Sequence, residues 1–377
     1  MKKLIAILVV FAMVATVAFA ETSISGSIET RWTIIQGSDA DNAPVTTEAK
    51  IHAGAIQLTG ANDDGTFGGT FKLTYGLGST GNDITSGFRA ERAFVWWQPI
   101  PQVKLWIGED GDGLMNSCGL TRWGHHKMDR GISVENWDDH NFLLGNYDAF
   151  GVVVSIMPVD WVTLHIAMTL AAREAGAPYG PIEYYDDSAA EAGLFQNGLQ
   201  IQAVIAPEGV GKFFITYRQS AAGGGWPIYS DRLGLTYQAA SFVDGLQFEI
   251  GGNYDLSDGT LVGDNSPFRL GLGALYAIED FGVKFRMMMQ PREVPNGTDW
   301  LWFRADLMPY YQFDFGTVFF NIRVASRNAD DINWHINPYL RLNVGSGDLR
   351  VGLLVEGSSA NNTNVTFKLP ISMLFAF

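Results

Sequence analysis

The last fourteen residues of the chain alternate between apolar and polar side chains with a period of two. One parity is apolar throughout and consists of Val365, Phe367, Leu369, Ile371, Met373, Phe375 and Phe377. The other parity carries Thr366, Lys368 and Ser372. Because successive side chains of a strand point to opposite faces, this pattern predicts a β-strand with one continuous apolar face. Such a face has to be covered by a protein core or by lipid.

An apolar strand face that ends on an aromatic residue resembles the closing strand of bacterial outer-membrane β-barrels. The resemblance implies insertion into the outer membrane of a diderm bacterium, with the lipid bilayer and the barrel-assembly machinery as partners. It also implies that Phe377 is part of the signal that this machinery reads. General character, without a diagnostic motif, suggests a fainter likeness to spirochaete major surface proteins.

The amino terminus has the pattern of a secretory signal peptide. Lys2 and Lys3 precede an apolar run, and Ala18-Phe19-Ala20 has the small-x-small form of a cleavage site. We therefore expect residues 1–20 to be removed and residues 21–377 to form a single barrel domain. The alternative, an uncleaved membrane anchor, is disfavoured because the run is short and a cleavage site follows it.

The remaining composition restricts how such a chain can cross a membrane. Cys118 is the only cysteine, so no disulfide bond can form within the chain. After the leader, no apolar run reaches the roughly eighteen residues that a membrane helix needs. Since backbone polar groups must be paired within lipid, only a closed barrel could span it.

The period-two pattern recurs along the whole chain. It predicts an all-β fold, a transmembrane antiparallel up-and-down β-barrel of about eighteen strands, with sixteen as the alternative. Eight connections are short and rich in Gly, Pro and Asp, as tight turns require. The intervening connections are longer, above all residues 108–148 and 171–195. Outer-membrane barrels have short periplasmic turns and long outer loops, which predicts the orientation.

The distribution of charge separates lipid-facing from lumen-facing positions. In sixteen strands with readable parity, the apolar face holds no Lys, Arg, Asp or Glu. A basic residue facing lipid at the bilayer midplane costs about 2–4 kcal/mol, so this absence favours lipid exposure. A soluble β-sandwich also has apolar strand faces and is the alternative fold. Aromatic residues near strand ends are expected in interfacial girdles: Tyr75, Trp96, Trp106, Trp161, Tyr217, Tyr237, Tyr254, Tyr276, Tyr311 and Phe377.

The polar parity is predominantly basic. Thirteen basic residues are predicted to line the channel: Arg31, Lys72, Lys104, Arg218, Arg232, Arg269, Lys284, Arg286, Arg304, Arg323, Arg341, Arg350 and Lys368. Five acids share that parity: Glu29, Glu249, Asp255, Asp306 and Glu356. The wall is therefore expected to be basic although the chain carries a net charge of −15.

The connection 108–148 is long and acidic. In general porins a loop of this kind folds into the barrel, and the resemblance implies that Asp129, Glu135, Asp138 and Asp139 constrict the pore. The alternative is a solvated external loop. Residues Glu109 to Gly113 resemble part of a calcium-binding loop but lack its later ligands. The nearby histidines match no metal-binding motif. We therefore expect no metal, no cofactor, no nucleic-acid partner and no enzyme activity.

These observations favour an outer-membrane porin, a passive aqueous channel for small hydrophilic solutes or ions. One alternative is a surface-exposed adhesin or antigen that uses the barrel as a scaffold. Another is a sugar-selective porin with lumenal aromatic residues, which would be Trp161, Trp302, Tyr310, Phe319 and Tyr339. By analogy with porins a homotrimer is a further expectation.

Overall fold

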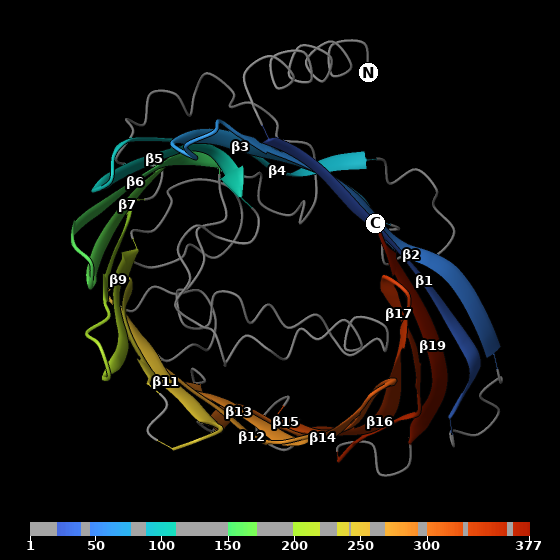
Figure 1. The fold of residues 1–377 in the computed structure, drawn as a ribbon. Coiled ribbons are helices and arrows are strands. Elements are labelled where there is room, and N and C mark those ends of the chain that lie inside the picture. The colour runs from blue at the N-terminus through green and yellow to red at the C-terminus, as the bar shows by residue number, and fades with distance from the viewer. Residues whose placement is uncertain are drawn as a thin grey trace.

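The chain folds into one closed antiparallel sheet (Figure 1). The computed structural model describes residues 21–38, 46–76, 88–110, 150–171, 199–218, 232–240, 243–256, 268–292, 300–326, 331–359 and 365–377. Its strands are β1 (Glu21–Ser38), β2 (Thr46–Ala61), β3 (Phe67–Gly76), β4 (Phe88–Ile100), β5 (Val103–Asp110), β6 (Phe150–Val159), β7 (Val162–Ala171), β8 (Leu199–Ile205), β9 (Gly211–Arg218), β10 (Arg232–Ala239), β11 (Leu246–Asp255), β12 (Phe268–Ile278), β13 (Phe281–Arg292), β14 (Trp300–Phe313), β15 (Gly316–Ser326), β16 (Ile332–Val344), β17 (Gly347–Gly352), β18 (Leu354–Ser358) and β19 (Thr366–Ala376). Within these ranges no helix is long and apolar enough to span a membrane.

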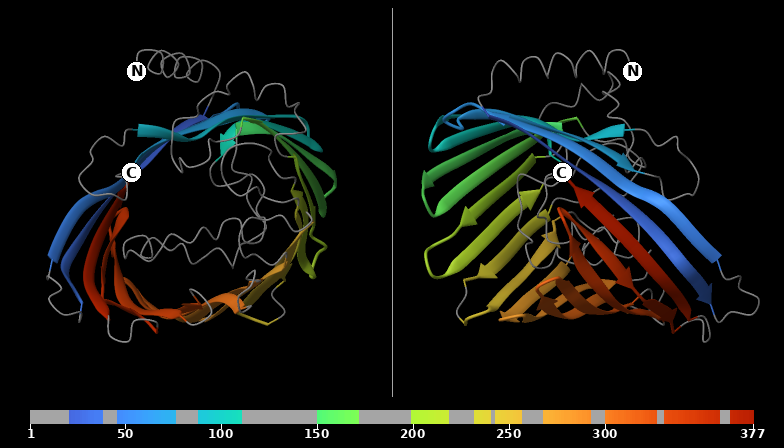
Figure 2. Two further views of the ribbon diagram at one scale, coloured as in Figure 1. Left: turned by 180° about the vertical axis from the view of Figure 1, so that it is seen from behind. Right: turned by 45° about the vertical axis from the view of Figure 1, so that its right-hand side comes forward.

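Each strand pairs with its neighbours in sequence, and β1 closes the sheet by pairing with β19. The strands tilt steeply around the wall, as Figure 2 shows. Two of the nineteen segments, β17 and β18, both pair with β16 and β19 and form a single barrel strand. The predicted up-and-down barrel of eighteen strands is therefore confirmed.

Two prolines cause the interruption between β17 and β18. Pro338 of β16 and Pro370 of β19 flank this point on the two neighbouring strands, and neither has an N–H to donate. The Leu353 amide donates to the Pro338 carbonyl at 2.9 Å. The Asn337 side-chain amide donates to the Leu353 carbonyl, also at 2.9 Å. The side chain thus replaces the backbone donor that Pro338 lacks, and the register continues unchanged beyond the break.

The eight predicted short turns join strands at one rim and are confirmed. In the β2–β3 turn, the Thr66 amide and hydroxyl donate to the Asp64 carboxylate at 3.0 and 2.7 Å. These hydrogen bonds hold the pKa of Asp64 below its usual value. The connections at the opposite rim, including most of 108–148 and 171–195, lie outside the described residues, as do residues 1–20.

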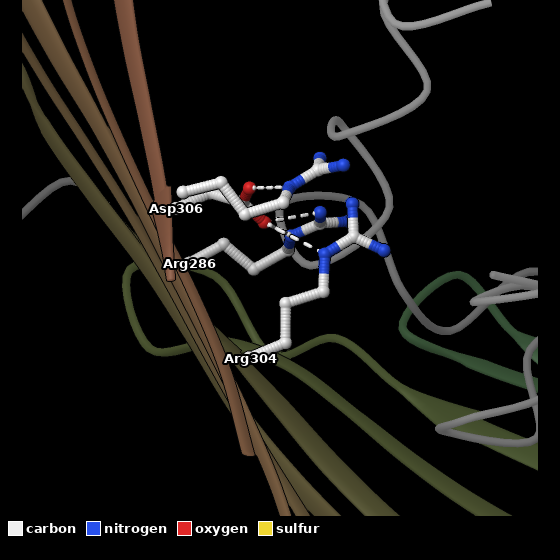
Figure 3. Close-up of polar contacts among 4 residues, drawn as sticks. Arg286, Arg304 and Asp306 are labelled. Carbon is white, nitrogen blue, oxygen red and sulfur yellow. Dashed lines mark hydrogen bonds and ion pairs between the residues drawn. The ribbon is translucent and has the colours of Figure 1, made fainter. Parts of the chain in front are cut away.

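The two faces of the wall differ as the alternation predicts. Arg286, Arg304 and Asp306 project into the enclosed space, which defines the inner face (Figure 3). Most exposed large apolar side chains of the strands have the opposite parity, for example Ile28, Leu235 and Phe375. This arrangement places apolar residues where lipid would contact the barrel and polar residues inside it.

The prediction that Trp96 and Trp106 belong to an outer girdle is wrong. Their Cα atoms are opposite one another, and Trp106 has the parity of Lys104 on the inner face. A register shift between β3 and β4 at Lys72 and Leu73 adds a residue to β4 and reverses its parity. Tyr254, Tyr276 and Tyr311 are exposed on the outer face, where a girdle requires them.

The compensation at Pro338 generates a stability prediction. We expect Asn337→Ala to lower the free energy of unfolding by about 1–3 kcal/mol, because the Leu353 carbonyl loses its donor. Urea unfolding of the purified, folded barrel measures the change. Asn333→Ala, on the same strand and face, is the matched control. Equal stability of the Asn337 variant and the wild type would contradict this role.

Candidate functional site

A row of charged side chains crosses the inner face of four neighbouring strands. Antiparallel pairing places Arg286 of β13 opposite Asp306 of β14, Asp306 opposite Arg323 of β15, and Arg323 opposite His335 of β16. Arg304 lies two residues before Asp306 and therefore on the same face. The hydrogen-bond ladders thus assemble these groups from positions up to 49 residues apart in the chain.

Three guanidinium groups converge on the single carboxylate of Asp306. The Arg286 Nε lies 2.9 Å from Asp306 Oδ2, and the Arg304 Nε lies 3.2 Å from the same oxygen (Figure 3). The Arg323 Nε pairs with the other oxygen, Oδ1. The Arg286 and Asp306 side chains are fully buried and the other two nearly so. Among these four side chains, three positive charges therefore share one negative charge.

A second group of the same kind lies nearer the turn rim. Asp348 of β17 pairs with Arg350 at 2.6 Å and with Arg341 of β16 at 3.1 Å. Arg341 is 44% exposed, so its guanidinium reaches the enclosed space. Further along the wall, Lys368 pairs with Glu356 at 3.0 Å. Each aspartate of these two clusters is therefore shared by more than one cation.

An aromatic stack separates the two arginine clusters. The rings of Phe319 and Tyr339 are stacked, with centroids 4.6 Å apart, and Tyr310 lies 5.7 Å from Phe319. Met308 and Leu354 pack against them. The Lys284 ammonium lies 5.7 Å from the Tyr310 centroid. Phe319 and Tyr339 are only 7% and 5% exposed.

This stack does not favour the sugar-track hypothesis. Stacking on a sugar ring requires an exposed aromatic face, whereas Phe319 and Tyr339 cover each other. Trp302 lies on β14 eight residues before Tyr310, and Trp161 lies in the β6–β7 turn. The structure therefore brings together three of the five predicted residues, and these three form part of a packed wall.

A second aromatic cluster lies on the far side of the barrel and was missed by sequence reasoning. Trp96 and Trp106 have centroids 5.8 Å apart, and Phe94 lies 5.5 Å from Trp106. The Lys104 ammonium lies over the Trp106 ring at 4.2 Å and near that of Trp96 at 5.3 Å. The shared parity of Lys104 and Trp106 is the signal that could have revealed it.

Uncharged polar side chains pair with one another on the inner face of β6–β9. Gln202 of β8 donates to the Thr216 hydroxyl of β9 at 3.0 Å, and both side chains are buried. Ser155 and His165 share a hydrogen bond of 2.8 Å between Oγ and Nδ1. Amide, hydroxyl and imidazole groups are therefore hydrogen-bonded to one another on these four strands.

The other predicted site residues fall into two sets. The first set lies at inner-face positions by strand register. Its pairs are Arg31 opposite Ser372, Arg218 opposite Arg232, Arg269 opposite Asn253, and Lys72 opposite Gln57. Asp129, Glu135, Asp138 and Asp139 lie outside the described residues, as do the loop histidines. Within the described ranges, no three His, Cys, Asp or Glu side chains are arranged to hold a metal ion.

Comparison with solved structures finds similar barrels. OpdK of Pseudomonas aeruginosa, crystallised with vanillate, shares 11% identity over 96% of this chain and all of OpdK, with a TM-score of 0.55. An improved crystal structure of the same protein, OccK1, gives 10% identity at the same coverage and a TM-score of 0.56. A triple mutant of Rhodopseudomonas blastica porin, 14% identical over 94% of this chain and all of its own, has a TM-score of only 0.46.

At these identities the likeness establishes the fold alone. No known protein family matches the chain. No curated protein matches it either.

The arginine cluster generates a test of its electrostatics. Asp306→Asn should lower the free energy of unfolding by about 3 kcal/mol, because it removes the negative charge that three buried guanidinium groups share. Denaturant unfolding of the purified barrel measures this loss. Asp314→Asn, in the exposed β14–β15 turn, is the control and should change little. Similar effects of the two variants would show that Asp306 does not hold the cluster.

Proposed function

We propose that this protein is an outer-membrane porin, a passive aqueous channel for small hydrophilic solutes that favours anions. The apolar outer face supports placement in a bilayer, and an eighteen-strand barrel is too wide for its own side chains to fill. The short turns would face the periplasm and the long loops the exterior. The observation that carries the anion preference is the excess of arginine over carboxylate on the wall of β13–β17.

Each of the two aspartates is outnumbered by the arginines that it contacts. Asp306 contacts three arginines, and Asp348 contacts two. The remaining positive potential acts across an enclosed gap, where low-dielectric walls concentrate the field. At about 0.1 M salt the Debye length is about 10 Å, so charges on the wall still act on ions near it. Anions should therefore be concentrated in the lumen relative to cations.

A narrower candidate is a channel that prefers organic anions carrying a ring. Basic groups and aromatic rings adjoin each other on both sides of the lumen, at Lys284 beside Tyr310 and at Lys104 beside Trp106. OpdK, which shares the fold, was crystallised with vanillate, an aromatic carboxylate. Such a solute could be attracted by the cations while its ring contacts the aromatic side chains.

Other expectations from the sequence extend this proposal. The acids of 108–148 would fold inward opposite the basic wall and narrow the pore. Phe377 would act as the assembly signal, and the barrels would associate as trimers. The described residues hold nothing that favours an adhesin scaffold or a likeness to spirochaete surface proteins.

Ion selectivity tests the proposed function directly. In a planar bilayer with a KCl gradient, the reversal potential of the wild type should show preference for chloride. Arg341→Gln should weaken that preference, since this exposed guanidinium reaches the lumen. Arg341→Lys keeps the charge and should retain it. Failure of the folded protein to conduct, or a preference for potassium, would overturn the proposal.

The position of the acidic loop has its own test. Neutralising Asp129, Glu135, Asp138 and Asp139 together should move the reversal potential further towards anions if the loop lines the pore. The matched control neutralises four acids of the other long connection, Glu183, Asp186, Asp187 and Glu191. Equal effects of the two quadruple variants at low salt would contradict the constriction role.

A further inference from the structure

The junction of the first and last strands is an irregular part of the barrel wall. From Ser27 opposite Ala376 to Thr33 opposite Pro370, β1 and β19 keep one register. Beyond that point Gln36 faces Lys368, so β1 contains one extra residue in a bulge. Pro370 has no N–H to contribute to the ladder there. The closing junction thus consists of two short ladders that differ in register by one residue.

A phenylalanine ring seated on a glycine marks the ladder nearer the turn rim. The Gly26 amide donates to the Phe377 carbonyl at 2.8 Å, and the Phe377 amide donates back at 3.0 Å. The Phe377 ring fills the space beside Gly26, so that a Cβ there would lie 2.3 Å from the ring Cζ. Such a Cβ would also approach the Ala55 carbonyl oxygen to 2.8 Å.

A second pair of the same kind lies in the ladder beyond the bulge. The Phe367 ring covers Gly37, where a Cβ would lie 2.7 Å from the ring Cζ. The three nearest atoms to that position all belong to this ring, so no backbone atom competes for the space. Gly37 and Phe367 are direct partners across the strands. Each ladder of the junction therefore contains one phenylalanine–glycine joint.

We propose that these two joints set the register in which the barrel closes, one on each side of the bulge. Backbone donors and acceptors repeat identically along a strand, so hydrogen bonds alone do not distinguish neighbouring registers. A slip by one residue would move a side chain to the opposite face. With the ring and glycine as partners, only the native register places each ring over a position without a Cβ. Phe375 has the same face and strand but lies opposite Ile28, so it lacks a glycine seat.

A double-mutant cycle at Gly37 and Phe367 tests how much this contact stabilises the barrel. Gly37→Ala should speed unfolding of the purified barrel about tenfold, because the new Cβ overlaps the ring. Phe367→Leu should also speed unfolding. The variant that combines Gly37→Ala with Phe367→Leu should unfold more slowly than the sum of the two single effects predicts. Phe375→Leu is the matched control and should have the smaller effect. Additive effects, or equal effects of Phe367→Leu and Phe375→Leu, would overturn the proposal.

Disulfide trapping in a Cys118→Ser background measures the register of β1 against β19 directly. Ser38→Cys with Thr366→Cys reports the native register, in which these residues are partners. Ser38→Cys with Val365→Cys reports the register that would result if the bulge were lost. Adding Gly37→Ala should shift crosslinking from the first pair to the second. If a variant does not assemble in cells, refolding into detergent gives the same readout. Unchanged crosslinking would contradict a role in register.

Discussion

Every backbone amide and carbonyl inside an apolar layer has to find a partner within the protein, and the architecture depends on meeting that requirement. An open sheet of this size would leave two unpaired edges. Pairing of β1 with β19 removes both edges and turns eighteen strands into a continuous ladder. The prolines in the strands show how strict the requirement is. Where Pro338 cannot donate, the Asn337 side chain supplies the hydrogen bond that Leu353 accepts.

Closure also creates the interior in which the charged groups reside. The same alternation that exposes apolar residues on the outside collects arginines from separate strands on the inside. Burial of a cation is costly unless it is paired, and Asp306 and Asp348 pair with five arginines. Each carboxylate is thus shared by more than one guanidinium group. The same residues supply the positive charges on which the proposed anion preference rests.

Sequence reasoning succeeded where strands are regular and failed where a bulge intervenes. Alternation alone placed Arg286, Arg304, Arg323 and Asp306 on one face, as observed. It misplaced Trp96, because the extra residue in β4 reverses the parity partway along that strand. It also misplaced Trp106 of β5, although the regular alternation puts this residue on the face of Lys104. A bulge leaves little trace in sequence, since it adds one residue without changing composition.

By itself, the sequence determined the strand number, the turn positions and the polarity of the two faces. These follow from a period of two that is local and repeats in every strand. Only the tertiary structure decided which charges meet. Three arginines share Asp306 because the stagger between strands places them at the same height along the barrel wall as this carboxylate. That stagger depends on all the ladders around the barrel. The seating of Phe377 on Gly26 was likewise settled by closure, because residues at opposite ends of the chain become neighbours only when the sheet meets itself.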